Sequence, residues 1–252
     1  MKEYIAEDEI SKEILNSAKL LQTVDVNALI IGSFGVGKKS LAKYILPKSK
    51  IYDAKVLQQD IADEVLTLHD DAIIVDKVDE ITNINLFLNW IETNNIRIIA
   101  ISTSEILNQK LQSIFSINLK IPDLHKREND TKLLVQKFSK EASSTLDMNT
   151  IQTSKLIINT SNNAHSIRKS IYFSYLFETI GEDEILMFME NYIYSNLKGE
   201  NSYKDFLYLF EAPLLKAAKK KYKSQVQMAK HLGLNRITLR KKLDIHKGFL
   251  DD

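Results

Sequence analysis

The sequence contains no cysteine, so disulfides, thiolate zinc sites and a cysteine nucleophile are excluded. No apolar run approaches the length of a membrane span. The first ten residues, MKEYIAEDEI, carry acids where a signal peptide needs an apolar core. These absences predict a cytoplasmic protein. The histidines lie far apart without the spacing of a metal site, and we expect surface or hydrogen-bonded roles for all five: His69, His125, His165, His231 and His246.

The chain is long enough for a sizeable core. Its 252 residues predict two domains, or one domain with a small module. A charged share of 27% and a hydrophobic share of 44% are ordinary for a globular protein. We find no internal repeat and no low-complexity tract.

The net charge of +1 conceals an asymmetry along the chain. From Ala212 to Leu250 there are eleven Lys or Arg residues and one acid, Asp244, which gives that stretch a net charge of +10. The rest of the chain therefore carries −9. A basic segment joined to an acidic body predicts a polyanionic partner for the segment alone, although a solvated lysine face is the alternative that charge by itself leaves open.

The segment KSQVQMAKHLGLNRITLRKKLDIH, residues 223–246, has the sequence pattern of a helix-turn-helix. Gly233 supplies the left-handed residue that a sharp turn needs, because it has no Cβ to clash. Leu234 follows as an apolar plug, and Asn235 is a favourable N-cap for the second helix. The apolar side of the first helix consists of Val226, Met228, Ala229 and Leu232.

The second helix of this segment divides its residues between two sides. We expect Ile237, Leu239 and Leu243 to be buried. The outer side and its flanks then carry Arg236, Thr238, Arg240 and Lys241. A recognition helix needs this division, because its first residues meet base edges and its cations meet phosphates. The pattern predicts binding to double-stranded DNA.

A second pattern lies near the other end of the chain, in GSFGVGKKS, residues 32–40. The surrounding stretch NALIIGSFGVGKKSLAKYIL predicts a short apolar strand, a glycine-rich turn and a helix, which is the context of a phosphate-binding loop. Gly32, Gly35 and Gly37 allow backbone N–H groups to converge on phosphate at a helix N-terminus. Lys38 is placed for the β- and γ-phosphates.

The C-terminal pattern resembles a known family. The run EAPLLKAAKKKYKSQVQMAKHLGLNRITLRKKL, residues 211–243, is similar to the C-terminal half of the Fis family, shared with the DNA-binding domain of NtrC-type bacterial enhancer-binding proteins. By position, the resemblance implies DNA-facing roles for Asn235, Arg236, Thr238, Arg240 and Lys241, and phosphate contacts for Ser224 and Gln225.

The same resemblance implies DNA bending and a homodimer through the helices before the motif. We place those helices in DEILMFMENYIYSNL, residues 183–197, and YKDFLYLFEAPLLKAAKKK, residues 203–221. Both are amphipathic with many large apolar residues, as a surface that buries a partner requires. Pro213 would kink the second helix. An apolar stripe that only packs on the rest of the chain is the alternative.

The resemblance to NtrC-type proteins extends over most of the chain. DDAIIVDKVDEI, residues 70–81, resembles the second nucleotide motif, with an apolar strand that ends at Asp76. IRIIAISTS, residues 96–104, is similar to the next core strand, with Thr103 at or near the polar sensor position. IPDLHKREND, residues 121–130, resembles the segment that leads into a helical lid. NNAHSIRKSI, residues 162–171, keeps Arg168 as the sensor arginine that would reach the phosphates.

These motifs imply an AAA+-like core that binds ATP or ADP with magnesium through the loop, Asp76 and Arg168. The general loop pattern has Ser or Thr after the lysine to hold magnesium, but here Lys39 follows and Ser40 comes one position late. NtrC-type proteins usually have an acid at that place, so this departure decides little. We still count Lys39 and Ser40 among the nucleotide-binding positions.

Other departures from the family concern catalysis. The family has a catalytic Glu after the strand aspartate, whereas this chain has Lys77, which cannot orient or deprotonate water at neutral pH. No arginine lies between Arg97 and Arg127, where trans-acting arginine fingers are expected. Such fingers contribute on the order of 10³–10⁵ in rate to related phosphoryl-transfer enzymes.

The loop with which family members contact the sigma factor of RNA polymerase, GAFTGA, has no counterpart. Asp76 lies only 38 positions after Lys38, and no glycine occurs between Gly37 and Gly181. We therefore expect the phosphate loop to keep its shape and its ligand while turnover is lost.

The predicted fold class is α/β, with an AAA+-like P-loop core followed by an all-α Fis-like module. We place the core at residues 1–130, a helical lid at 131–180 and the dimerisation and DNA-binding domain at 181–252. The predicted function is a dimeric, sequence-specific transcription regulator without ATPase activity. Two alternatives stay open: an active ATPase that remodels a polymerase complex, and a docking partner that modulates a full-length NtrC-type regulator.

Overall fold

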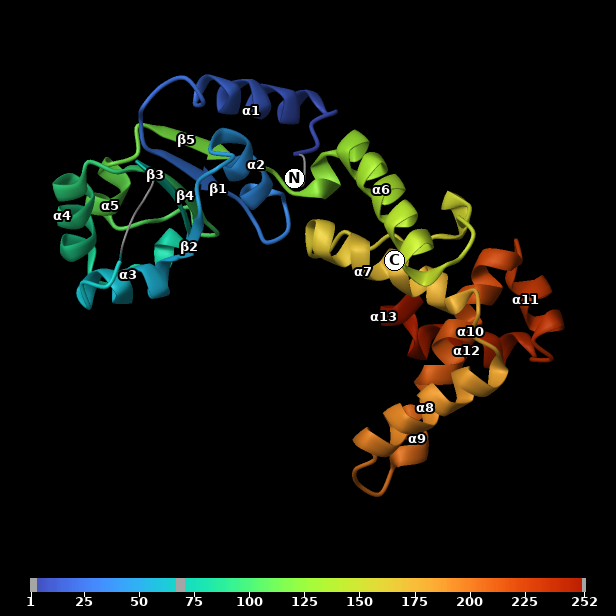
Figure 1. Cartoon of the computed structure of the whole chain (residues 1–252). Helices are drawn as coiled ribbons and strands as arrows, with labels where there is room; N and C mark the ends of the chain where they lie inside the picture. The colour runs from blue at the N-terminus through green and yellow to red at the C-terminus, as the bar shows by residue number, and fades with distance from the viewer. Residues whose placement is uncertain (1–3, 67–70, 251–252) are drawn as a thin grey trace. The chain divides into compact units, whose positions relative to one another are not determined.

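A computed structural model describes residues 4–66 and 71–250 of the chain. It divides into two compact units, Met1–Thr179 and Ile180–Asp252 (Figure 1). The boundary that we placed after residue 180 differs from this division by one position. Two residues named above lie outside the described residues: His69, and Asp70 at the start of the second nucleotide motif.

Unit 1 begins with a five-stranded parallel sheet of order β2-β3-β4-β1-β5. Its strands are β1 (Ala28–Ile31), β2 (Ile51–Asp53), β3 (Ala72–Asp76), β4 (Arg97–Ser102) and β5 (Ile117–Lys120). The three central strands consist mostly of Ile, Val, Leu and Ala and are buried on both faces, as parallel sheets require. The α/β fold class is thereby confirmed for the core.

Helices cover both faces of this sheet (Figure 1). Those of the core are α1 (Glu9–Leu20), α2 (Lys38–Ile45), α3 (Ala54–Ala62), α4 (Ile84–Asn94) and α5 (Gln109–Ser113). Because side chains alternate along a strand, Leu29 packs with α3 and α4, whereas Ile30 packs with α1 and α2. The carboxyl ends of β1, β3 and β4 meet at one edge, where ligands bind in open α/β sheets.

A helical subdomain follows the sheet within unit 1. Helices α6 (Glu128–Leu146) and α7 (Asn163–Phe177) pack on each other around Val135, Ile167 and Ile171. The Tyr175 hydroxyl and the Ser139 hydroxyl are hydrogen-bonded at 2.8 Å within this core. We expected TSNNAHS, residues 160–166, to be a loop, but α7 already begins at Asn163. The loop is therefore shorter than its polar composition predicts.

Unit 2 is entirely helical within the described residues. Its helices are α8 (Glu182–Asn196), α9 (Ser202–Phe206), α10 (Tyr208–Lys221), α11 (Gln225–His231), α12 (Arg236–Ile245) and α13 (Lys247–Leu250). Leu215, Met228, Leu239 and Leu250 form its core. Helix α10 runs through Pro213, and the interruption of the predicted second helix lies instead at Leu207, between α9 and α10.

Within the described ranges, no helix is long and apolar enough to cross a membrane. In the same ranges, no cluster of His, Asp and Glu side chains is arranged to hold a metal ion.

Candidate functional site

The glycine-rich loop connects β1 to α2 at the carboxyl edge of the sheet. Gly35 and Gly37 have φ angles of 81° and 107°, which side chains other than glycine rarely adopt. A Cβ at Gly35 would also lie 2.6 Å from the carbonyl oxygen of Asn162. Among the described residues, the backbone N–H groups of Gly35, Gly37 and Lys38 have no intramolecular acceptor. The loop therefore offers free donors at the N-terminus of α2, the arrangement that binds phosphate.

The carbonyl groups of the loop are held from the opposite side. Phe34 O accepts a hydrogen bond from the Asn163 side chain at 3.0 Å, and Gly35 O accepts one from the Ala164 N–H at 3.2 Å. Val36 O accepts a hydrogen bond from Arg127 at 3.0 Å. Since these contacts turn the carbonyls outward, they leave the N–H groups facing the ligand side. The start of α7 and the residue before α6 thus shape the loop.

Arg127 is the centre of a buried polar network. Its side chain is 2% exposed and pairs with Asp130 at 2.7 Å. Asp130 also accepts hydrogen bonds from the Ser11 hydroxyl and the N–H of Asp8. Burial opposes ionisation of Asp130, but these hydrogen bonds and the Arg127 charge hold its pKa below the ordinary value. The Tyr4 ring lies over the Arg127 guanidinium at 5.6 Å.

Sequence reasoning assigned no role to Arg127, Asn163 or Tyr4. Arg127 and Asn163 lie inside motifs that we had recognised, at residues 121–130 and 162–171. A buried ion pair at i and i+3 in a charged stretch, Arg127 with Asp130, cannot be told from a surface pair without the structure. Contacts between segments more than one hundred residues apart leave no local signal.

Lys38 lies where the loop pattern predicts. Its ammonium group donates to Gly32 O and, at 2.8 Å, to Ser33 O. Burial lowers the pKa of Lys38, while the carboxylates of Asp76 and Asp79 act in the opposite direction. The ammonium group is therefore held within the loop, beside the free N–H groups.

Asp76 is the last residue of β3, at the same edge, and its carboxylate forms an ion pair with a lysine. The Lys39 ammonium lies 2.7 Å from Asp76 Oδ2. The next residue, Lys77, has a left-handed backbone with φ of 58° and pairs with Asp53 at 3.0 Å. Asp53 ends the edge strand β2, so Lys77 points along the sheet edge toward that strand. Asp76 and Lys39 are thus together, as expected for residues of one site, while Lys77 is bound elsewhere.

At the end of β4, a buried hydroxyl is supplied by Ser102, the residue before Thr103. Ser102 is fully buried, and its hydroxyl donates to Asp79 at 2.8 Å, whereas Thr103 is exposed. Thr103 follows the last residue of β4, so its side chain leaves the sheet. A sensor role at or near Thr103 stays a prediction, and the buried hydroxyl beside it is that of Ser102.

Arg168 is not brought to the loop. Its guanidinium is bonded to Glu141 on α6 and lies over the Tyr172 ring at 5.6 Å. Besides Asn163 and Ala164, His165 of α7 also reaches the loop, where its ring packs against Phe34 with centroids 5.6 Å apart. A phosphate contact by Arg168 requires release from Glu141 and stays a prediction.

In unit 2, the turn between α11 and α12 has the local geometry that the sequence predicts. Gly233 is left-handed, with φ of 64°. The Ser224 hydroxyl caps α11 by accepting the Gln227 N–H at 3.3 Å, and Asn235 caps α12 by accepting the Thr238 N–H at 2.8 Å. Both caps fix where the helices begin.

Three cations of α12 face solvent. Arg236, Arg240 and Lys241 are exposed, while Thr238 is half-buried. In the part of the chain that the structure describes, none of the three cations is in an ion pair. Arg236 and Arg240 are four residues apart and share one face of the helix. This face is a candidate nucleic-acid interface.

Two apolar residues of the motif differ from expectation. Ile237 is 84% exposed and Val226 is 50% exposed, although we expected both to be buried. Leu239 and Met228 fill the core between the helices instead. Helices α11 and α12 are short and belong to a small unit. Each therefore contributes only one or two buried side chains to the core.

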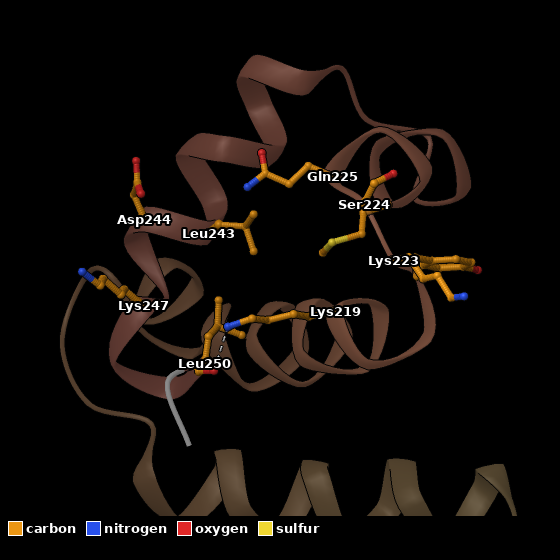
Figure 2. Close-up of a pocket in the computed structure, with 10 residues that line it drawn as sticks. Lys219, Lys223, Ser224, Gln225, Leu243, Asp244, Lys247 and Leu250 are labelled. Atoms are coloured by element: carbon orange, nitrogen blue, oxygen red, sulfur yellow. Dashed lines mark hydrogen bonds between the residues drawn. The ribbon is translucent and has the colours of Figure 1, made fainter.

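Ser224 and Gln225 border a hollow of about 360 Å³ between α10, α11, α12 and α13 (Figure 2). Gln225, Leu243 and Leu250 turn toward this hollow, and Lys219 donates to Leu250 O at 3.3 Å. Lys223 and Lys247 lie at its rim. The hollow is lined by both polar and apolar side chains, with lysines at its edge.

Three of the histidines contact neighbouring side chains. His246 bonds to Glu211 at 2.9 Å, and His231 stacks on Tyr222 with centroids 4.4 Å apart. His165 packs on Phe34, as described above. These contacts give structural roles to three of the five histidines.

The parallel sheet, the glycine-rich loop after β1 and the helical subdomain that follows match the fold of an AAA+ core. No protein-family model matches the sequence, and no curated protein matches it.

The solved structures that are similar include NtrX from Brucella abortus. Its complex with ATP matches with a TM-score of 0.58 and 14% identity, over 98% of this chain and 69% of that chain. Its complex with ADP matches with a TM-score of 0.54 and 13% identity, over 96% and 69%. A third NtrX structure matches with a TM-score of 0.57 and 12% identity, over 97% of this chain and 69% of that chain. At such identities the likeness concerns the fold.

Proposed function

We propose that the chain is a cytoplasmic, dimeric, sequence-specific DNA-binding transcription regulator, with a degenerate NtrC-type core and a Fis-type helix-turn-helix. The observation that carries the proposal is the capped pair α11 and α12, joined at the left-handed Gly233, with Arg236 and Arg240 exposed on one face. The net charge of +10 around this pair supports a polyanionic partner.

In this proposal, α12 enters the major groove of DNA. Arg236 and Arg240 read guanine edges or clamp phosphates, since a guanidinium can bond both acceptors of guanine at once. Asn235 uses its side-chain oxygen as a cap and keeps its NH₂ group for DNA. Thr238, Lys241, Ser224 and Gln225 act at the flanks. The exposed Ile237 adds an apolar contact of the kind that thymine methyl groups accept.

The homodimer is proposed from the apolar surface of α8 and α10. The large exposed residues of these helices are Ile185, Leu186, Met187, Phe188, Tyr192, Tyr194, Phe210 and Leu214. Isolated exposed apolar residues are normal, but such a number on two helices of one small unit is typical of a surface that buries a partner. Two copies would present two recognition helices to successive major grooves.

For unit 1 we propose nucleotide binding without turnover. The NtrX structures with ATP and ADP support a nucleotide in a core of this fold. Lys77 stands where a carboxylate would polarise water and is paired with Asp53. The alternative is an active ATPase that remodels a polymerase complex. Such an enzyme needs a base at this position, where the chain has Lys77. Docking on a full-length NtrC-type regulator is a further alternative, which the size of the mixed complex would reveal.

Fluorescence anisotropy on an AT-rich DNA duplex tests the DNA-binding proposal. We expect tight binding that weakens with salt, with a logarithmic slope of about −0.9 for each phosphate contact. Arg240→Ala should cost about 1–3 kcal/mol of binding free energy, because it removes a base or phosphate contact.

The matched control is Lys204→Ala, which removes an exposed cation from α9, outside the helix pair. It should leave the affinity within about twofold. Equal losses in both variants, or wild-type binding no tighter than that of a basic peptide of the same charge, would contradict the proposal and favour the docking alternative.

A further inference from the structure

Two consecutive lysines begin α2, and the structure gives them different partners. Lys38 turns back to the loop carbonyls of Gly32 and Ser33. Lys39 reaches across to the end of β3, where its ammonium group lies 2.7 Å from Asp76 Oδ2. The Asp76 side chain is 11% exposed, and that of Lys39 is 62% exposed. A cation of the chain itself is therefore bound to the strand carboxylate.

This arrangement does not fit magnesium. Mg²⁺ needs oxygen ligands in near-ideal octahedral geometry at about 2.0–2.1 Å. In the general loop pattern, the hydroxyl after the loop lysine supplies one of these ligands. Here that position is Lys39, and the hydroxyl of Ser40 comes one residue later, about 100° further round the helix. A metal ion at Asp76 would have to displace an ammonium group and would meet its repulsion.

The same geometry suits a phosphate. The Lys39 side chain starts from the first turn of α2, beside the free N–H groups of Gly37 and Lys38. Its exposed ammonium has three donors, and the carboxylate of Asp76 uses one side of it. The remaining donors are free for a phosphate oxygen. Lysine binds phosphate as a mobile point charge, so this contact needs no rigid geometry.

We propose that the loop binds ADP or ATP without magnesium, and that the Lys39 ammonium, held by Asp76, takes the place of the metal. This inference rests on the nucleotide binding proposed above and specifies its chemistry. It also accounts for a core without turnover, because no metal ion bridges the β- and γ-phosphates to stabilise the charge that develops during transfer.

Calorimetric titration of the full chain with ADP tests the inference, once with magnesium chloride in excess and once with EDTA. The wild-type protein should bind ADP at least as tightly in EDTA as with magnesium. Magnesium chelates ADP and thereby lowers the concentration of the metal-free form that the site would bind. Lys39→Thr restores the hydroxyl of the general pattern. It should weaken binding in EDTA about tenfold, and magnesium should then tighten it.

The matched control is Lys43→Thr, which makes the same change on the same helix, where Lys43 bonds to Ser49 O and not to Asp76. It should behave as the wild type in both buffers. Thermal unfolding of each variant without ligand establishes that it is folded.

Two results would overturn the inference. Magnesium that tightens ADP binding about tenfold in the wild type would mean that the metal binds in spite of Lys39, and nucleotide binding itself would stand. Absence of ADP binding in both buffers would overturn nucleotide binding as well. Neither result would touch the DNA-binding proposal, which the anisotropy measurement decides separately.

Discussion

The guanidinium of Arg127 joins segments that lie far apart in the sequence. It donates to Val36 in the loop, to the backbone of Ile5 and to Ser11 near the N-terminus, and it pairs with Asp130. All of these partners are oxygen atoms, as a buried guanidinium with five donors requires. One residue thereby fixes the loop against the N-terminal segment and the start of α6.

Replacing Arg127 by Met should destabilise unit 1 strongly. The change leaves Asp130 charged and buried without its partner, which costs about 3–5 kcal/mol. Urea unfolding followed by circular dichroism measures the loss. The double variant with Asp130→Leu should regain part of that loss, since neither charge then remains buried. A single variant that loses less than about 1 kcal/mol would contradict a structural role for the pair.

At this scale, the sequence predicted the residues that carry local signals. Lys38 and the glycines of the loop follow from the loop pattern, and Asp76 follows from the resemblance to NtrC-type proteins. The structure places Lys38 and Asp76 at one edge of the sheet. The partners of the loop carbonyls could not be predicted, because Asn163 and Arg127 reach them across more than ninety residues.

Among the helices, α10 and α12 are connected by one acid. Glu211 on α10 bonds to Lys242 near the end of α12 and to His246, which follows that helix, at 2.9 Å. The bond to Lys242, followed by that to His246, lowers the pKa of Glu211 below its ordinary value of 4.5. The proposed recognition helix is therefore anchored at its C-terminal end, opposite the end that would meet DNA first.

Glu211→Gln should lower the stability of unit 2 in a pH-dependent manner. A lowered pKa means that the carboxylate contributes fully above about pH 4.5 and loses its contribution as the pH falls through the lowered pKa. We expect a loss of about 1 kcal/mol at pH 7, because the group is partly exposed. The difference from wild type should shrink below pH 4.5. Denaturant unfolding at several pH values measures it.

Glu200→Gln, at an exposed position of the same unit, is the control and should behave as wild type at every pH. A Glu211→Gln effect that is constant between neutral and acidic pH would mean that the acid contributes by packing and not by its charge.

Helix types and turns could be predicted in this region, but burial could not. Gly233 and Asn235 have the roles that their chemistry favours, because turns and caps are decided locally. Ile237 and Val226 were misassigned, because apolar periodicity does not tell how many positions a small core needs. In α12, Leu239 alone is fully buried among the described residues.

The whole chain consists of two units with separate cores. Leu29 and Ile30 belong to the sheet of unit 1, and Leu215 and Leu239 belong to the helical core of unit 2. The basic stretch from Ala212 to Leu250, with a net charge of +10, lies within unit 2. Each unit therefore has its own source of stability and its own proposed ligand.

Calorimetric unfolding should show two transitions. ADP should raise the midpoint of one transition and duplex DNA that of the other, since a ligand stabilises only the state that binds it. At a ligand concentration of about one hundred times Kd, the expected gain is about 2.7 kcal/mol for the unit concerned. One transition that both ligands shift equally would mean that the two cores unfold together.

The phosphate loop is held in shape by its outer contacts with Arg127, Asn163 and Ala164 before any ligand arrives. A nucleotide that enters it pays little for ordering the backbone, so arrival should be limited mainly by diffusion and orientation. Differences in affinity between ADP and ATP would then lie mainly in their dissociation rates. A response of the protein to one nucleotide or the other would depend on how long each stays bound.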